Sequence, residues 1–260
     1  MSAEVWDLPE AERRERLKRA LALSASSVPQ GIGTQKERTL HSVLKYYMEP
    51  DEEYHEIPVG SFIADIYRDG RITEIQTGSF SPLRKKLEAF LPEFPVTIVY
   101  PIPWHKWVHW ILPDTGEVSG GRRSPKKGEL YMLLPELYRI RPFLNHPNLS
   151  FLPLLIDLRE YRYQDGWGRE GKRGSHRADR VPFEIGPSLL LRGAADYVSL
   201  LPQLPDPFTM KDFIKAARLS PRGASYALSA LRELGVARKS GQEGRSYLYT
   251  ISKEESSHAL

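Results

Sequence analysis

The 260-residue sequence contains no cysteine. This absence excludes a disulfide scaffold, a thiolate zinc site, an iron–sulfur cluster and a cysteine nucleophile. The sequence also lacks an apolar run of the roughly 18 residues that a membrane span needs, and its mixed-charge beginning does not follow the pattern of a secretory signal. We therefore expect a cytoplasmic protein without a membrane partner. Its 40% hydrophobic content is sufficient for a globular core.

The excess of positive charge is small overall but concentrated in one segment. Lys and Arg number 37 against 33 Asp and Glu, which gives a net charge of +4. Residues 51–208 are nearly balanced, whereas residues 209–250 hold eight basic and three acidic side chains, a net +5. Because Lys and Arg neutralise phosphate groups, DNA is the partner that we expect for this segment.

Helical and strand patterns alternate along the chain and predict an α/β protein with a mixed sheet. We expect helices over 9–23, 35–48, 81–91 and 129–144, and strands over 55–60, 61–67, 71–77, 96–102, 106–112 and 152–158. Three prolines within 202–207 cannot continue a helix or a central strand, and so they indicate a domain boundary. The expected parts are an N-terminal helix and linker (1–33), a main domain (34–201), a small domain (207–251) and a tail (252–260).

The stretch 61–77 predicts a β-hairpin that opposes two carboxylates. Asp69-Gly70 favours a two-residue turn, and the register of such a turn places Asp65 opposite Glu74. Directly opposed residues have Cβ atoms about 4.5–5.5 Å apart, and like charges in such a pair destabilise the sheet. A hard cation such as Mg²⁺ or Mn²⁺, held by both carboxylates, would remove the conflict. The alternatives are a solvated sheet face or one protonated carboxyl group.

An amphipathic helix, a hairpin carrying Asp65, Glu74 and Gln76, and a further helix resemble the core of the PD-(D/E)XK nuclease superfamily over about residues 35–111. The resemblance implies a restriction-endonuclease-like fold in which Asp65 and Glu74 bind Mg²⁺ or Mn²⁺ and Gln76 positions the attacking water. It also implies an assisting role for Glu37 on the preceding helix, with His41 one turn later on the same face. Gln76 stands where the family usually has Lys, and it carries no charge to stabilise the transition state.

Further basic side chains are candidate nucleic-acid contacts because they attract phosphate. Two stand on the helix expected over 81–91, where they are also candidates for the charge that Gln76 lacks, and four stand in the Gly-rich loop 119–128: Lys85, Lys86, Arg122, Arg123, Lys126 and Lys127. A second basic stretch, 159–180, interleaves Arg with aromatic residues that can stack on unpaired bases, although acidic residues accompany it.

Residues 207–251 resemble a winged helix-turn-helix domain. Thr209 and Ser220-Pro221 are typical helix starts, Gly235 is a typical helix end, and two strand-like runs follow around the loop 240–246. The resemblance implies DNA contacts from the second helix and from the wing: Arg222, Ser225, Tyr226 and Arg245. Winged helices also serve as protein–protein modules, so that alternative stays open.

Two functions follow as expectations. The first is a metal-dependent DNA endonuclease that hydrolyses phosphodiester bonds and is targeted by the C-terminal winged helix. The second is a catalytically inactive nuclease-fold protein that binds DNA as a regulator or accessory factor, an alternative that Gln76 keeps open. A protein-interaction adaptor would leave both the opposed carboxylates and the basic segment unexplained. A monomer and a homodimer are both compatible with the sequence.

Overall fold

The computed structural model describes residues 5–26, 38–164 and 175–252. The chain forms two compact units, each assembled from separate stretches of sequence. The first unit comprises residues 1–77, 99–129 and 153–188, and the second comprises residues 78–98, 130–152 and 189–260. This division follows packing, and it differs from the consecutive segments that the sequence suggested. Within the described ranges, no helix is both long enough and apolar enough to cross a membrane.

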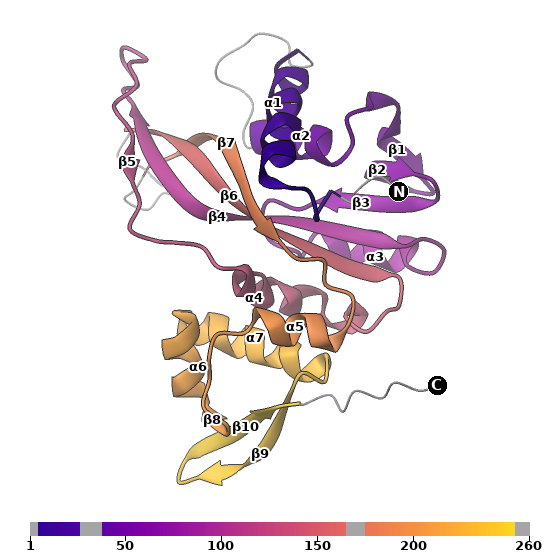
Figure 1. Cartoon of the computed structure of the whole chain (residues 1–260), viewed down its shortest axis with the longest axis vertical. Helices are drawn as coiled ribbons and strands as arrows, with labels where there is room; N and C mark the ends of the chain where they lie inside the picture. Colours follow the sequence, from indigo (N-terminus) through magenta and orange to yellow (C-terminus); the bar gives the residue numbers. More distant parts are fainter. Residues whose placement is uncertain (1–4, 27–37, 165–174, 253–260) are drawn as a thin grey trace. The chain divides into compact units, whose positions relative to one another are not determined.

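The large sheet has seven strands in the order β1-β2-β3-β4-β6-β7, with β5 paired to β4 (Figure 1). The strands are β1 His55–Val59, β2 Phe62–Arg68, β3 Arg71–Ile75, β4 Val96–Ile111, β5 Arg122–Arg123, β6 Leu149–Tyr163 and β7 Arg177–Ser188. The pairs β1–β2, β2–β3, β4–β5 and β6–β7 are antiparallel. Tight turns join β1 to β2 and β2 to β3, whereas α3 lies in the connection between β3 and β4.

Two helices cover the part of the sheet that belongs to the first unit. Helix α1 (Glu10–Ser26) packs against α2 (Arg38–Met48), and both contact β7 (Figure 1). The buried side of α2 consists of apolar residues that recur at helical spacing: Leu40, Val43, Leu44 and Tyr47. This packing fixes the rotation of α2, and it thereby fixes where the polar residues of the helix meet the sheet.

The second unit consists mainly of helices and one small sheet. Its elements are α3 Leu83–Phe90, η2 Leu130–Leu133, α4 Leu134–Leu137, η3 Tyr138–Phe143, α5 Ala194–Leu200, β8 Phe208–Thr209, α6 Met210–Ala217, α7 Pro221–Glu233, β9 Ala237–Glu243 and β10 Ser246–Ile251. The small sheet has the strand order β8-β10-β9. Helix α7 contacts α4, α6 and η3 through buried small and apolar residues: Ala224, Ala227, Leu228 and Leu231.

Local hydrogen bonds define the ends of α6 and α7. The Thr209 hydroxyl accepts a 3.3 Å bond from the Asp212 amide, and the Asp212 carboxylate accepts a 2.8 Å bond from the Thr209 amide, which forms a capping box. The Ser220 hydroxyl accepts a 3.1 Å bond from the Gly223 amide at the start of α7. Gly235, with a φ of 71°, follows the end of α7. The helix starts predicted at Thr209 and Ser220 are therefore confirmed.

The α/β class and the large sheet are confirmed, while three of the expected elements need correction. The strands expected over 96–102 and 106–112 are one strand, β4, which continues through Pro103. The helix expected over 129–144 is a succession of short 3-10 and α turns, since Ile140 is non-helical and Pro142 follows it. Residues 177–188 form strand β7, which the sequence did not predict because its prolines and charges hide the alternation of a strand.

Candidate carboxylate site and candidate nucleic-acid interface

The β2–β3 hairpin has the register that the sequence predicts. Asp69 and Gly70 have φ values of 50° and 72°, and positive φ at both central residues is what a type I′ turn requires. Three residue pairs face each other: Ile66 with Thr73, Tyr67 with Ile72 and Arg68 with Arg71. The paired register ends at Ile66 and Thr73; Asp65 and Glu74 directly follow this last pair and contact each other through a side-chain hydrogen bond.

The two carboxylates accept hydrogen bonds across the hairpin. The Oδ2 atom of Asp65 accepts a 2.7 Å bond from the Ile75 amide, and the Oε1 atom of Glu74 accepts a 3.3 Å bond from the Asp65 amide. Glu74 is 2% exposed and the Asp65 side chain is 14% exposed. Helix α2 adds His41, whose Nε2 atom lies 3.2 Å from Asp65 Oδ2. These polar partners offset part of the cost of burying the two carboxylates.

The donor set of this pair does not amount to a metal site within the described residues. No three His, Asp or Glu side chains come close enough together to hold a metal ion in residues 5–26, 38–164 and 175–252. One oxygen of Asp65 and one of Glu74 accept bonds from backbone amides, whereas Mg²⁺ demands six oxygen ligands in near-octahedral geometry. Glu37 lies outside the described residues. Gln76 directly follows β3, and its backbone N–H donates a 2.9 Å bond to the Val99 carbonyl.

Two further polar clusters join separate elements of the first unit. The Thr39 hydroxyl of α2 donates a 2.6 Å bond to Asp179 on β7, and burial raises the pKa of Asp179. Glu160 on β6 is 3% exposed and accepts bonds from Lys106 and Arg162 at 3.1 and 2.6 Å. Burial raises the pKa of Glu160, but the two cations outweigh burial and the net pKa is lowered. The sequence did not reveal these clusters, because a partner on an unrecognised strand leaves no local signal.

The basic loop expected over 119–128 is partly a strand, because Arg122 and Arg123 form β5, which pairs with β4. All four of its candidate phosphate contacts are exposed: Arg122, Arg123, Lys126 and Lys127. The Arg123 guanidinium lies 5.6 Å from the centre of the Trp107 ring, and Lys127 Nζ lies 5.4 Å from the centre of the Trp104 ring. Such cation–π contacts hold the loop against the strand while its charges stay accessible.

Helix α7 carries a row of polar residues along one side, of which Ser229 is half-buried and the others are exposed; it is here called the α7 stripe: Arg222, Ser225, Ser229 and Arg232. Their spacing of three, four and three residues is that of one helix face. The Tyr226 ring stacks on Tyr138, with centroids 4.3 Å apart and planes at 2°, and Arg222 Nε donates a 2.8 Å bond to the Tyr226 hydroxyl. Tyr226, expected as a DNA contact, therefore takes part in the packing of α7 on η3 and orients Arg222.

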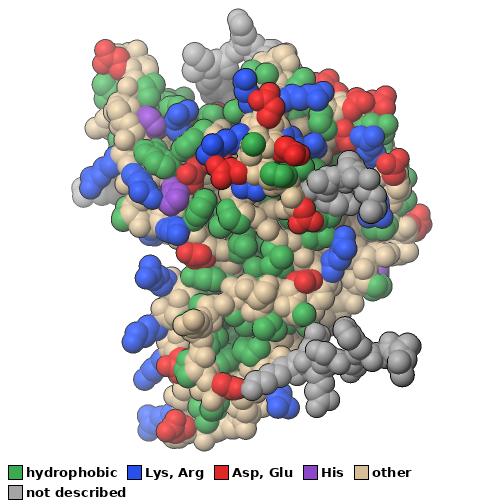
Figure 2. Space-filling view, in the orientation of Figure 1, with side chains coloured by type: hydrophobic (Ala, Val, Ile, Leu, Met, Phe, Trp, Pro, Cys, Tyr) green, Lys and Arg blue, Asp and Glu red, His purple; other side chains and the backbone are tan. Residues whose placement is uncertain are grey.

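The β9–β10 hairpin carries further positive charge in the same unit. Arg245 is exposed in its turn, beside Gly244 with a φ of 56°. Lys239 Nζ lies 3.3 Å from the centre of the Tyr247 ring. Figure 2 shows Lys and Arg side chains along the edge of this unit, near α6 and the neighbouring end of α7. Lys85 and Lys86, on α3, are exposed and half-buried respectively.

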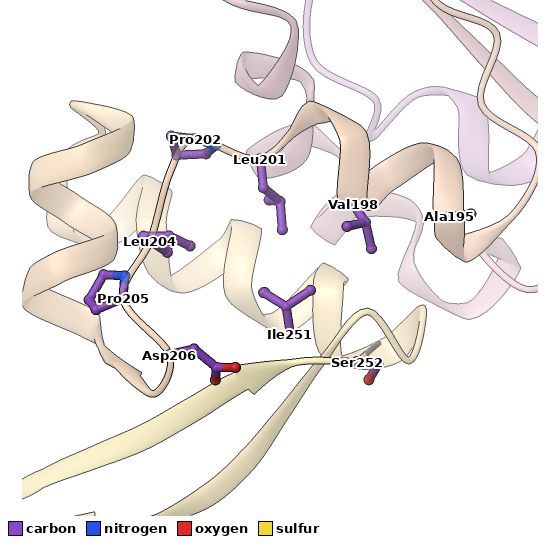
Figure 3. Close-up of a pocket in the computed structure, with 9 residues that line it drawn as sticks. All are labelled: Ala195, Val198, Leu201, Pro202, Leu204, Pro205, Asp206, Ile251 and Ser252. Atoms are coloured by element: carbon purple, nitrogen blue, oxygen red, sulfur yellow. The ribbon is translucent and has the colours of Figure 1, made fainter. Parts of the chain in front are cut away.

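A cavity of about 400 Å³ lies between α5, the proline-rich segment that follows it and the end of β10 (Figure 3). Its lining is mostly apolar and includes Val198, Leu201, Leu204 and Ile251. Asp206 is the one ionisable side chain among the described residues that line it. Because no electrophilic partner accompanies this carboxylate among the described lining residues, we assign no catalytic role to this cavity.

Comparisons with known proteins place the chain in a family. A family model described as "Domain of unknown function (DUF8091)" matches residues 38–192, from α2 to just beyond β7. An uncharacterized protein of Treponema pallidum (strain Nichols) is 30% identical over 220 residues, which cover 84% of this chain and 86% of the relative. No solved structure matches the chain. The family match includes the β2–β3 hairpin and spans more than half of the sequence, and the chain therefore belongs to the DUF8091 family.

Proposed function

We propose that this protein binds double-stranded DNA through its second unit. The observation that carries the proposal is the α7 stripe, a mostly exposed row of polar and basic residues on a helix that begins at a defined cap. The succession α6, turn, α7, β9 and β10, together with the strand order β8-β10-β9, supports a winged-helix module. The net charge of +5 over residues 209–250 supports a phosphate-bearing partner.

The α7 stripe has the chemistry of a helix that enters the major groove. That groove is wide enough for one α-helix, and Arg near the start of such a helix can bond guanine or a phosphate. Ser225 and Ser229 are small, so they allow the helix to approach the base edges closely. Arg222 is held by Tyr226 in one orientation, which reduces the entropy lost on binding. The β9–β10 hairpin corresponds to the wing, and Arg245 in its turn is the phosphate contact there.

Fluorescence anisotropy of a labelled DNA duplex, measured over a range of salt concentrations, tests this proposal. We expect Arg222→Ala to weaken binding about tenfold, or about 1.4 kcal/mol. Arg71→Ala is the matched control, because Arg71 is an exposed cation at the β2–β3 turn in the first unit. This control should leave the dissociation constant nearly unchanged. A chain that binds no duplex at any salt concentration would reject the proposal.

A metal-dependent nuclease is the second candidate function, and the close approach of Asp65 and Glu74 favours it, since the Asp65 backbone amide donates a 3.3 Å bond to Glu74 Oε1. Asp65 and Glu74 are the residues that would contribute to holding Mg²⁺ or Mn²⁺, although the described residues do not complete the ligand set. Incubation of plasmid DNA with the chain and Mn²⁺ tests this candidate. Cleavage that disappears in Asp65→Ala and in Glu74→Ala supports a nuclease. Duplex binding without cleavage leaves a non-catalytic DNA-binding protein.

A further inference from the structure

The second unit contains a strongly basic cleft that extends beyond the α7 stripe. The cleft has a volume of about 670 Å³, and its lining, here called the basic cleft, comes from η3, α7 and β9: Arg141, Ser229, Arg232, Glu233, Ala237, Arg238 and Lys239. Four cations stand against one carboxylate in this lining, which gives it a formal charge of +3. So much like charge in one cleft is costly unless an anion occupies it or partners screen it.

Hydrogen bonds hold two of the four cations of the basic cleft, Arg141 and Arg238, in place. Arg141 Nη1 donates a 3.2 Å bond to the Ser229 hydroxyl, and Arg141 Nε lies 3.5 Å from Glu233 Oε2. A residue of η3 is thereby fixed to α7 across 88 positions of sequence. Arg238 Nε donates a 3.3 Å bond to the Thr250 hydroxyl of β10. The cleft is therefore partly organised without a ligand, which lowers the entropy cost of binding one.

We infer that the basic cleft binds a phosphate group, supplied by the DNA backbone, and this inference rests on the proposed function. The lining contains no aromatic ring and one apolar residue, Ala237, so it lacks the aromatic platform on which unpaired bases usually stack. Guanidinium groups, in contrast, match the oxygens of a phosphate. Ser229 and Arg232 belong both to the α7 stripe and to the cleft, so a strand that follows the stripe passes over the cleft.

The inference gives residues 130–152 a part in DNA binding. Arg141 belongs to that stretch, about 65 residues before the segment that resembles a winged helix. The DNA interface is thus larger than residues 207–251. A protein fragment that begins near 207 lacks Arg141 and has an incomplete phosphate site.

The salt dependence of duplex binding in the full chain tests the cleft. The slope of log K against log salt is negative, and each phosphate contact that is lost reduces its magnitude by about 0.9. We expect Arg141→Ala to reduce the magnitude of the slope by about this amount and to weaken binding about tenfold. Arg192→Ala removes an exposed cation of the same unit that does not line the cleft, and it should leave the slope unchanged.

Glu233→Gln is the second variant, because it removes the one carboxylate of the cleft. Its formal charge rises from +3 to +4, so we expect tighter duplex binding and a steeper salt slope. A merely structural role for the Arg141–Glu233 ion pair predicts the opposite, since losing a partner would loosen η3 on α7. If Arg141→Ala fails to fold, Lys239→Ala replaces it, because Lys239 also lines the cleft and its loss should reduce the salt slope in the same way.

The outcomes separate the inference from the proposed function. Binding that depends on Arg222 but keeps its salt slope in Arg141→Ala and Lys239→Ala overturns the cleft and leaves the proposed function standing. A chain that binds no duplex rejects the proposed function, and calorimetry with inorganic pyrophosphate then decides the fate of the cleft. Heat that is lost in Arg141→Ala assigns the cleft to a free phosphate anion. An absence of heat overturns the inference.

Discussion

His41 and Asp65 meet between α2 and β2, with His41 Nε2 at 3.2 Å from Asp65 Oδ2. The same oxygen accepts the 2.7 Å hydrogen bond from the Ile75 amide on β3. A single carboxylate oxygen thus connects a helix with both strands of the hairpin. A substitution of Asp65 therefore changes the stability of the chain as well as any chemistry at this carboxylate.

Asp65→Ala leaves the Ile75 amide without its acceptor in a partly buried position. We expect the free energy of unfolding to fall by about 1–3 kcal/mol. Asp65→Asn keeps a side-chain oxygen that can accept the bond, so its loss should be clearly smaller. Urea denaturation of the two variants measures the difference. Equal losses would show that the negative charge, and not the hydrogen bond, stabilises this part of the hairpin.

Glu160 makes the stability of the first unit depend on acidity. Its pKa is lowered in the folded chain because Arg162 and Lys106 outweigh burial. A carboxyl group whose folded pKa is lowered contributes stability above its ordinary pKa of 4.5, and this contribution is lost as the pH falls through the folded pKa. We expect Glu160→Gln to cost about 2 kcal/mol at neutral pH and much less in acid.

Urea denaturation of Glu160→Gln at neutral and at acidic pH measures this difference. Glu88→Gln on α3 is the control, because Glu88 is exposed on the surface. It should change the unfolding free energy by less than about 0.5 kcal/mol at either pH. A constant cost of Glu160→Gln at every pH would contradict the assignment of the acid-sensitive contribution to this carboxylate.

The cap of α7 allows stability and the proposed DNA contact to be separated at one residue. Ser220→Ala removes the acceptor for the Gly223 amide, and we expect a loss of about 1 kcal/mol in the free energy of unfolding. Ser220→Asp keeps an acceptor and places a negative charge where a helix start favours it. The same charge lies near Arg222, so duplex binding should weaken several-fold although stability is retained. Denaturation and anisotropy on the same two variants check both effects, and unchanged duplex affinity in Ser220→Asp would argue against an interface at the start of α7.

The sequence is most informative where the decisive signal is local. Asp69-Gly70 determines the hairpin turn, and the turn determines a register that brings Asp65 and Glu74 into contact on adjacent strands. The starts of α6 and α7 follow from Thr209 and Ser220, because a capping side chain bonds an amide three residues ahead. In each case, the interacting groups are separated by a few residues, so the pattern is visible in the sequence.

Contacts between distant segments are not encoded in such patterns. Arg141 lines a cleft with α7, and Tyr226 stacks on Tyr138, in each case through a partner 88 residues away. Both contacts depend on how η3 packs against α7, and short-range periodicity carries no information on that packing. The helix position of Tyr226 alone predicts a DNA contact, whereas in the structure its ring stacks on Tyr138.

Substitution of Gly128 tests whether close packing against β4 positions the basic loop. A Cβ atom at Gly128 would lie 2.2 Å from the carbonyl oxygen of Pro103, and the Gly128 amide donates a 3.1 Å bond to the Trp104 carbonyl. Gly128→Ala must therefore push the loop away from β4, and we expect a cost of about 1–3 kcal/mol in urea denaturation. Gly120→Ala is the matched control in the same loop, because no atom lies within 4 Å of its added Cβ. The displaced loop also withdraws Lys127 from the Trp104 ring, so the tryptophan fluorescence of Gly128→Ala should differ from that of the control. Equal stability and equal fluorescence in the two variants would mean that the loop is not packed against β4 in solution.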